Sequence, residues 1–395
     1  MALTWFDAHL DLAYLAVSGR EMAPPAGTAL DAAGGPHPPA AVTLRSLAQG
    51  GVRFSLGTIF TEPVEPEGAG TAKPAPALEP QMYTAGDAGR AHAVGRAQLE
   101  AYRTWQDRGL VRLGLVEELR VDAGLGEIRG GMGVSEVVQP SIASRIALLR
   151  DPECLRVGIL MENADPIRTA DELEWWKSHG VVAIGLAWAR ASRYAGGNTT
   201  DLGLSDAGRE LVREMDRLDV VHDVSHLSDR ALRELLDATD TPVIASHSNC
   251  RALLGAGPPP GWPPNLPASL SMQRHLADDT IREIGRRGGV IGLNLFSRFL
   301  VGPGRGDARA SIDDCVRHIE HVCEIMGHRR GVGLGSDMDG GFSAKLLPEG
   351  IDAPRDLARL AQALVARRWA DDDIRGFACE NWARFFLERH GAGRR

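Results

Sequence analysis

The sequence predicts an α/β fold, a TIM-type (β/α)8 barrel with long Pro-rich surface loops. Its 395 residues suit one barrel with insertions. Short apolar segments alternate with amphipathic helical segments, as in a parallel sheet that is wrapped by helices. Several of these segments, such as VIGLNL, are apolar on both alternating faces, which the strands of a parallel barrel require. We therefore expect residues 1–395 to form a single barrel domain.

Eight apolar segments are predicted to be the strands of this barrel. They are residues 4–8, 52–60, 157–161, 181–187, 220–225, 242–246, 290–295 and 332–336. A ninth segment, 110–116, is predicted to lie outside the ring as an extra strand or a helix end.

The segments between the strands have the periodicity of amphipathic helices. Residues 229–238 follow Ser228, a favourable N-cap, and residues 271–287 and 312–326 have a similar pattern. The tail 356–389 is also predicted to be helical and to pack its aromatic side chains back onto the barrel: Trp382, Phe385 and Phe386. Residues 23–41, 62–80 and 255–267 are rich in Pro, Ala and Gly and are predicted to be surface loops.

The composition restricts the class of partner. The chain has 44 basic and 52 acidic residues and no long basic run, which argues against nucleic acid or a membrane surface as a partner. No segment approaches the ~18 consecutive apolar residues of a membrane span, and the first residues do not resemble a secretory signal. The five cysteines are scattered without CxxC spacing, as expected of reduced thiols. We expect a cytoplasmic protein that acts on a small molecule.

The first candidate site residues lie in the motif Asp7-Ala-His9-Leu-Asp11. Side chains two apart on an extended backbone face the same way, so His9 and Asp11 can bind one cation together. Alone, this pattern is weak, because a surface histidine beside a helix-capping aspartate is the more common explanation of it. Glu162, directly after the apolar segment VGILM, is predicted to point into the carboxyl end of the barrel. It could instead begin a helix.

Two histidines end consecutive predicted strands, His226 in VVHDVSHLS and His247 in VIASHSN. Adjacent strands lie about 4.8 Å apart, so the two imidazoles can share a metal ion. His222 lies within its strand and is expected to be an interior histidine.

After the last strand, the glycines of GLGSDMDGG allow a tight turn from which Asp337 and Asp339 emerge, although an acidic turn that binds nothing has the same pattern. Its spacing is incomplete for a calcium loop.

Together, six of these side chains close predicted strands in order around one ring: His9, Asp11, Glu162, His226, His247 and Asp337. Carboxylate and imidazole ligands suit Zn²⁺, with Mn²⁺, Co²⁺ or Fe²⁺ as alternatives. The first five residues offer too many ligands for one tetrahedral ion. We therefore expect two ions that share a bridging carboxylate, for which Glu162 is the natural candidate.

The same segments resemble the membrane dipeptidase (renal dipeptidase) family, peptidase family M19 of the amidohydrolase superfamily. DAHLDL is similar to its DGHNDL, LMENAD to its GVEG region, HDVSHLS to its IDLSHVS, IASHSN to its FSHSS and GLGSDMDG to its GSDFDG motif. The resemblance implies that His9 and Asp11 bind one zinc, that His226 and His247 bind the other, and that Glu162 bridges them. It also implies that Asp337 is the acid at the end of the barrel. In QRHLADD, Arg274 would hold the carboxylate of the substrate.

The chain departs from the family pattern on the substrate side. Trp188 stands where the family has a histidine that steadies the scissile carbonyl, and Phe296 stands where it has a tyrosine. Loss of such a donor typically costs roughly 10²–10³ in rate unless another group, such as Arg190 or Arg193, replaces it. The resemblance also implies a homodimer as the usual assembly.

The sequence thus predicts a two-zinc hydrolase that cleaves the amide bond of dipeptides by attack of a metal-bridging hydroxide, with Asp337 as general acid. Its substrate would contact Arg274, Trp188, Phe296 and Asp339. Two alternatives remain open. One is the same metal site acting on another small amide or a lactone, such as an N-acyl or D-amino acid derivative. The other is a degenerate member without activity.

Overall fold

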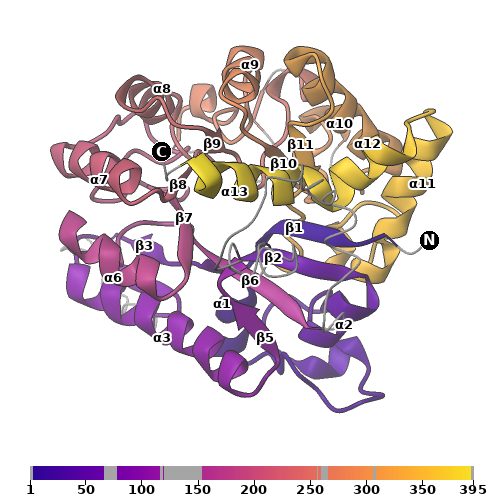
Figure 1. Cartoon of the computed structure of the whole chain (residues 1–395), viewed down its shortest axis with the longest axis horizontal. Helices are drawn as coiled ribbons and strands as arrows, with labels where there is room; N and C mark the ends of the chain where they lie inside the picture. The colour runs from indigo at the N-terminus through magenta and orange to yellow at the C-terminus, as the bar shows by residue number, and fades with distance from the viewer. Residues whose placement is uncertain are drawn as a thin grey trace, which may run out of the picture.

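The computed structural model describes residues 3–65, 78–115, 119, 154–255, 257–258, 266–305 and 308–392. Its strands lie at the centre of the molecule and its helices surround them (Figure 1). Within these residues, no helix has both the length and the apolar character needed to cross a bilayer.

Eight parallel strands form a nearly closed barrel in the order β10-β11-β1-β2-β6-β7-β8-β9. They are β1 (Trp5–Leu10), β2 (Val52–Ile59), β6 (Leu155–Met161), β7 (Val181–Gly185), β8 (Val221–Asp223), β9 (Val243–Ile244), β10 (Ile291–Leu293) and β11 (Val332–Leu334). Each lies within a predicted segment or differs from it by a few residues, so the predicted TIM-type barrel is confirmed. The ninth segment forms β5 (Val111–Leu113), which pairs with the beginning of β6 outside the ring, as an extra strand.

The ring closes between β9 and β10, where a parallel bridge joins Ala245 to Ile291. The Gly292 N–H donates to the Ala245 carbonyl over 2.8 Å. A side chain on Gly292 or Gly335 would come within 1.9 Å or 1.8 Å of the Ser246 carbonyl oxygen. Glycine at these two positions therefore lets the neighbouring strands approach closely enough to close the barrel.

The helices lie around the barrel (Figure 1). They are α1 (Leu12–Val17), α2 (Leu44–Gln49), α3 (Ala88–Asp107), α6 (Leu173–Ser178), α7 (Asp206–Arg217), α8 (Asp229–Ala238), α9 (Asp278–Arg286), α10 (Ile312–Met326), α11 (Ala358–Ala366), α12 (Asp371–Arg375) and α13 (Asn381–Ala392). The predicted Ser228 cap of α8 is confirmed, since its side chain accepts the Ala231 N–H. The predicted helix 271–287 begins only at Asp278, because Leu276 pairs through its backbone with Asn249 and Arg251.

The three segments that were predicted to be loops differ in their structure. Residues 23–41 are mostly irregular, with one short 3-10 turn at Leu30–Ala33. The segment 62–80 is not a simple loop, because its start forms β3 (Glu62–Val64), which pairs with β4 (Met82–Thr84). Residues 66–77 and most of 255–267 lie outside the described residues.

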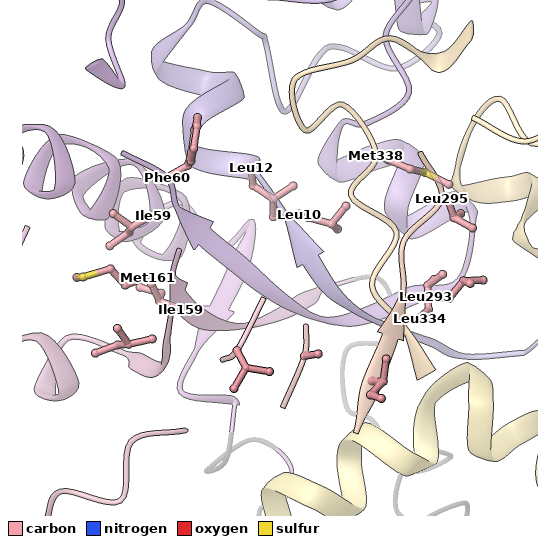
Figure 2. Close-up of a cluster of buried hydrophobic side chains, with 14 of the residues drawn as sticks. Leu10, Leu12, Ile59, Phe60, Ile159, Met161, Leu293, Leu295, Leu334 and Met338 are labelled. Carbon is pink, nitrogen blue, oxygen red and sulfur yellow. The ribbon is translucent and has the colours of Figure 1, made fainter. Parts of the chain in front are cut away.

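Two apolar clusters fill the molecule. The larger lies between the strands and the surrounding helices, and Figure 2 shows part of it, with Ile59, Ile159 and Met161 on β2 and β6. The smaller fills the amino-terminal end of the barrel, and we call it the floor cluster. It packs inward side chains of the strands against α13, and among its members are Phe6, Phe54, Leu56, Leu160, Val221, Ile244, Trp382 and Phe386. The predicted packing of the C-terminal helix onto the barrel is thus confirmed.

Inward side chains change character along the strands. Because the side chains of a strand alternate with a period of two, the next inward residue after a floor residue lies two positions later. At these positions the side chains are polar and line the carboxyl end of the barrel, which we call the mouth: Thr58 after Leu56, Glu162 after Leu160, Asp223 after Val221 and Ser246 after Ile244. The fold thus places an apolar floor beneath a polar mouth.

Candidate metal centre

The structure brings the six predicted site residues together at the mouth. His9 lies near the end of β1, and the others lie just beyond β1, β6, β8, β9 and β11. Their side chains are at most 11% exposed. Six polar side chains from five strands thus share one buried volume.

Glu162 lies between two groups of ligand atoms. Its Oε2 is 3.6 Å from His9 Nε2, and that nitrogen is 3.7 Å from Asp11 Oδ1. Its Oε1 is 3.2 Å from His226 Nε2 and 3.5 Å from His247 Nε2. Two sets of potential ligand atoms each fit within 4.8 Å, His9 with Glu162 and His247, and His9 with Asp11 and Asp337. One carboxylate therefore faces both sides of the cluster, one oxygen to each.

Ser246 determines the orientation of two of the histidines. Its hydroxyl donates to Asp223 Oδ2 over 2.6 Å, so it must accept from His247 Nδ1, at 2.8 Å, and from His9 Nδ1, at 3.3 Å. The Nδ1 atoms therefore carry the protons, and both Nε2 lone pairs face Glu162. Such partners on the far nitrogen are typical of histidines that bind metals.

Asn198 has the same effect on the third histidine, because its Oδ1 lies 3.0 Å from His226 Nδ1. The Nε2 atoms of His226 and His247 are 2.9 Å apart, and with the proton of each ring on Nδ1 both would direct a lone pair to the space between them. Two facing lone pairs repel each other, and a cation between them removes the repulsion. The Nε2 of His9 is likewise buried, and among the described residues it has no hydrogen-bond partner. The donor set thus fits metal ions.

The same burial changes the acidity of the carboxyl groups. It raises the pKa of Asp11 to about 7, and the charge of Glu162 adds to that rise. Burial raises the pKa of Glu162 to about 8, although the charge of Arg274 lowers it. Burial also raises the pKa of Asp337 to about 8. The Thr58 hydroxyl donates to Asp11 and acts in the opposite direction. Buried carboxylates that are crowded in this way favour a bound cation.

The pKa values of two imidazoles are shifted in the direction that metal binding requires. Burial lowers the pKa of His226 well below its ordinary value, and the charges of Arg274 and His9 lower it further. The pKa of His247 is lowered in the same way. Neutral imidazole is the form that binds a metal ion, so these two ligands need not first lose a proton at neutral pH.

Asp337 is held rigidly beside His9. Its Oδ2 accepts from Asn294 Nδ2 over 2.9 Å, its Oδ1 is 4.0 Å from His9 Nε2, and its N–H donates to the His9 carbonyl. Its backbone is left-handed, with a φ of 59°, which is uncommon for a residue other than glycine. The glycines of GLGSDMDGG were expected to make this turn, and Gly341 does adopt the left-handed conformation, but so do Asp337 and Asp339.

The sequence predicted that Asp339 faces the substrate, but its carboxylate is directed elsewhere. Its Oδ2 pairs with Arg20 Nη1 over 2.6 Å, and its carboxylate accepts the N–H groups of Ala41 and Val42. Arg20 also donates to the carbonyls of residues 34, 36 and 42. A carboxylate occupied in this way anchors the segment 34–42 and has little capacity left for a substrate.

A cavity of about 390 Å³ opens onto these candidate metal ligands. This volume is within the range of small-molecule sites. Among the described residues, its wall contains Asp11, Glu162, His226, His247 and Asp337 together with aromatic side chains: Tyr14, Phe60, Trp188, Phe296, Phe299 and Phe342. Trp188 packs against Phe60 and His226, with ring centroids 5.2 Å and 5.9 Å away. Trp188 and Phe296 thus both line the cavity.

Arg274 and Arg193 are both held by hydrogen bonds within the protein. Arg274 is buried behind His247 and is not among the described residues of the cavity wall. It donates to the His247 carbonyl over 2.7 Å and to Ser248 Oγ over 3.0 Å. Arg193 donates to the carbonyls of Asp165 and Ile167, so it is not free to replace a lost donor.

Several residues of the centre were missed by sequence reasoning. Asp223 and Ser246 stand in the same motifs as the predicted histidines and at inward positions, so strand alternation could have found them. Thr58, Asn198 and Asn294 have no local signal, because only the fold brings them to the site. His222 is interior as predicted, and its Nε2 lies 2.8 Å from Asp216.

Comparison with known proteins identifies the family. The model of the membrane dipeptidase family, peptidase family M19, matches residues 143–392. The chain belongs to this family. Membership supports metal-dependent hydrolysis of dipeptides. The matched part of this M19 protein contains Glu162, His226, His247 and Asp337, whereas His9 and Asp11 precede it.

Individual relatives agree with this assignment. An uncharacterized protein in the pqqA 5′ region of Klebsiella pneumoniae is 31% identical over 221 residues, which are 54% of this chain and 74% of that protein. An uncharacterized dipeptidase of Schizosaccharomyces pombe is 34% identical over 221 residues, but the match covers only 47% of its length. A crystal structure of a metallopeptidase from Rhodobacter sphaeroides, with a phosphinate mimic of L-Ala-D-Ala, superposes with a TM-score of 0.72. It is 24% identical, and the match covers 98% of this chain and 99% of that chain. This likeness supports the fold.

Proposed function

We propose that the chain is a dipeptidase that binds two divalent cations, Zn²⁺ by the chemistry of its ligands. The observation that carries the proposal is Glu162, whose two oxygens face His9 on one side and His226 and His247 on the other. In this assignment His9 and Asp11 hold one ion, the two remaining histidines hold the other, and Glu162 bridges them. When bound, the ions would lower the pKa of water towards ~7 and polarise the scissile carbonyl.

Asp337 is proposed to be the general acid. Its carboxylate would take up the proton that the attacking water releases and give it to the departing amine. Asn294 holds Oδ2, which leaves Oδ1 on the side of His9 and the cavity. The left-handed backbone supports the same role, because it fixes the carboxyl group relative to the ligands.

Arg274 is proposed to act on the substrate carboxylate mainly through its charge. Two of its nitrogens already donate to Ser248 and His247, and its Nε has no partner among the described residues. A bidentate contact would have to compete with these bonds. Trp188 and Phe296 would form the apolar part of the substrate site.

The proposal is tested on the purified protein after removal and restoration of metal. Metal analysis should find two ions per chain, and zinc should restore hydrolysis of L,L- or L,D-dipeptides after chelation. Lactones and N-acyl amino acids complete the panel. Preferential cleavage of these compounds would replace the dipeptidase assignment by the alternative of another small amide or ester on the same metals. Absence of any metal-dependent turnover would indicate a degenerate member.

Asp337→Asn separates the acid from the metal ligands. We expect normal metal content and loss of turnover by at least ~10²-fold, the lower range for general acid catalysis. Unchanged kcat would remove Asp337 from the reaction. Loss of metal would instead indicate that Asp337 is a metal ligand, which its position near His9 and Asp11 also allows.

A further inference from the structure

One wall of the cavity contains hydrogen-bond acceptors that the proposed reaction does not use. They come from Glu62, Glu79 and Gln81, which all line the cavity. Glu62 begins β3, and its N–H donates to the carbonyl of Gln81, which directly precedes β4. The small β3–β4 sheet thus fixes Glu62 and Gln81 relative to each other.

Gln81 has an acceptor without a donor. The residue is 3% exposed, and its Nε2 donates to Glu79 Oε2 over 3.0 Å. The opposite orientation of the amide would set its oxygen against a carboxylate, so the hydrogen bond fixes which atom is which. Its Oε1 is buried and has no partner among the described residues. Because an unsatisfied buried acceptor is costly, this oxygen points to a ligand that donates.

The two carboxylates add negative charge at the same place. Burial raises the pKa of Glu62, and the charge of Glu79 raises it further, whereas Gln81 and Arg190 act against this rise. Arg190 is exposed, so water and salt screen its charge. Both carboxylates also raise the pKa of Tyr14, as Asp11 does. Tyr14, which lines the same cavity, is therefore close enough to the acidic wall and to Asp11 to be affected by both.

We propose that Glu62, Glu79 and Gln81 form a subsite for a cationic group of the substrate, an ammonium or a guanidinium. The inference rests on the proposed dipeptidase function and names the kind of substrate. Two carboxylates and one carbonyl oxygen offer at least three acceptors, which matches the three donors of an ammonium group. In a dipeptide this group is either the α-ammonium or a basic side chain.

The energetic gain from such a group should be measurable. Hydrogen bonds between charged groups that are shielded from water are about twice as strong as neutral ones. We expect the subsite to favour a cation over a neutral group of the same shape by about 10- to 100-fold in affinity.

Calorimetric titration of the zinc-loaded Asp337→Asn protein tests the subsite without turnover. The probes are L-Lys-L-Ala, L-norleucyl-L-Ala, which lacks only the side-chain amine, and Nα-acetyl-L-Lys-L-Ala, which lacks the α-ammonium charge. Weaker binding of the norleucyl peptide assigns the subsite to a basic side chain, and weaker binding of the acetylated peptide assigns it to the α-ammonium. Equal affinity for all three overturns the inference.

Variants connect the preference to the wall. Glu62→Gln with Glu79→Gln should reduce the preference to less than about threefold, and Glu65→Gln, an exposed neighbour outside the described cavity wall, should retain it. Gln81→Leu removes the amide oxygen at similar size and gives a second test if the double variant does not fold. A preference that survives both changes would overturn the assignment.

Failure of the subsite is distinguishable from failure of the proposed function. If the zinc-loaded wild-type protein hydrolyses Ala-Ala and Lys-Ala but the probes bind equally, only the subsite is wrong. If no dipeptide is hydrolysed, the dipeptidase proposal is wrong, and the titration still decides whether this wall binds a cation.

Discussion

The two ends of the barrel use the same strands for opposite purposes. At the floor, Phe6 packs against Phe386 and Trp382 of α13, with ring centroids 6.0 Å apart in both pairs. At the mouth, the inward side chains are carboxylates, hydroxyls and, just beyond the strands, imidazoles. One step of two residues along a strand separates the two regions. The barrel thus isolates an apolar core from a polar site without a separate domain for either.

The two ends differ in what makes them stable. Burial of apolar surface stabilises the floor by about 25 cal/mol per Å², whatever the pH and metal content. Burial of carboxylates without a counter-charge is costly, and the raised pKa values of Asp11, Glu162 and Asp337 express that cost. Cations bound at the mouth would offset it, so stability and function are coupled there and uncoupled at the floor.

The largest expected effect is on a proposed ligand. His226→Ala should lose metal and activity together. The loss in metal affinity should exceed the ~10–100-fold that follows from removing a hydrogen bond that only supports a ligand. Metal content by atomic emission and kcat on a dipeptide measure it. A variant that retains two ions per chain would refute the ligand assignment and weaken the contrast between mouth and floor.

The matching change at the floor should have the opposite profile. Phe386→Ala leaves a cavity beneath Phe6 and is expected to lower the free energy of unfolding by about 3–5 kcal/mol. Below the unfolding transition, its metal content and kcat should equal those of the wild type. Urea unfolding and metal analysis measure both. Loss of metal from the folded variant would mean that the two ends are coupled after all.

A smaller effect is expected at Ser246, which orients His9 and His247 from below. Ser246→Ala should weaken metal binding by ~10–100-fold and leave the stoichiometry of two unchanged at saturating zinc. Competition with a chelator of known affinity measures it. Ser178→Ala, at an exposed helix end, is the control and should bind metal like the wild type. Equal affinities for the two variants would show that Ser246 is not needed to orient the imidazoles.

The contrast between the ends also explains how much the sequence revealed. The barrel could be predicted because continuous apolar strands and amphipathic helices are local patterns, and the six site residues could be found because each closes a strand. Asp339 was placed wrongly because its position after Asp337 does not reveal the distant Arg20 that pairs with it. The hydrogen bonds of Arg274 to His247 and Ser248 could not be predicted either, because they depend on the fold.

The smallest expected effect is the response of the metal-free protein to pH. The ordinary pKa is 3.8 for Asp and 4.5 for Glu, whereas in the folded chain Asp11 titrates at about 7 and Glu162 and Asp337 at about 8. Between these values the folded state binds more protons than the unfolded state, so the free energy of unfolding falls as pH rises. The lowered pKa values of His226 and His247 act in the opposite sense only up to about 6.5, their ordinary value. Above that pH the histidine contribution fades, so the carboxyl groups dominate the window from pH 6.5 to 8.

Thermal unfolding in chelator should accordingly give a lower Tm at pH 8 than at pH 6.5, by about 2–4 °C for each kcal/mol lost. The zinc-loaded protein should not show this fall, because the bound ions keep the carboxylates ionised throughout the window. Glu162→Gln removes one titrating group and should make the slope of the metal-free protein shallower, whereas Phe386→Ala should lower Tm equally at both pH values. A metal-free protein whose Tm is constant or rises over this window would mean that the mouth buries its carboxyl groups without cost, and the proposed difference between the two ends would not hold.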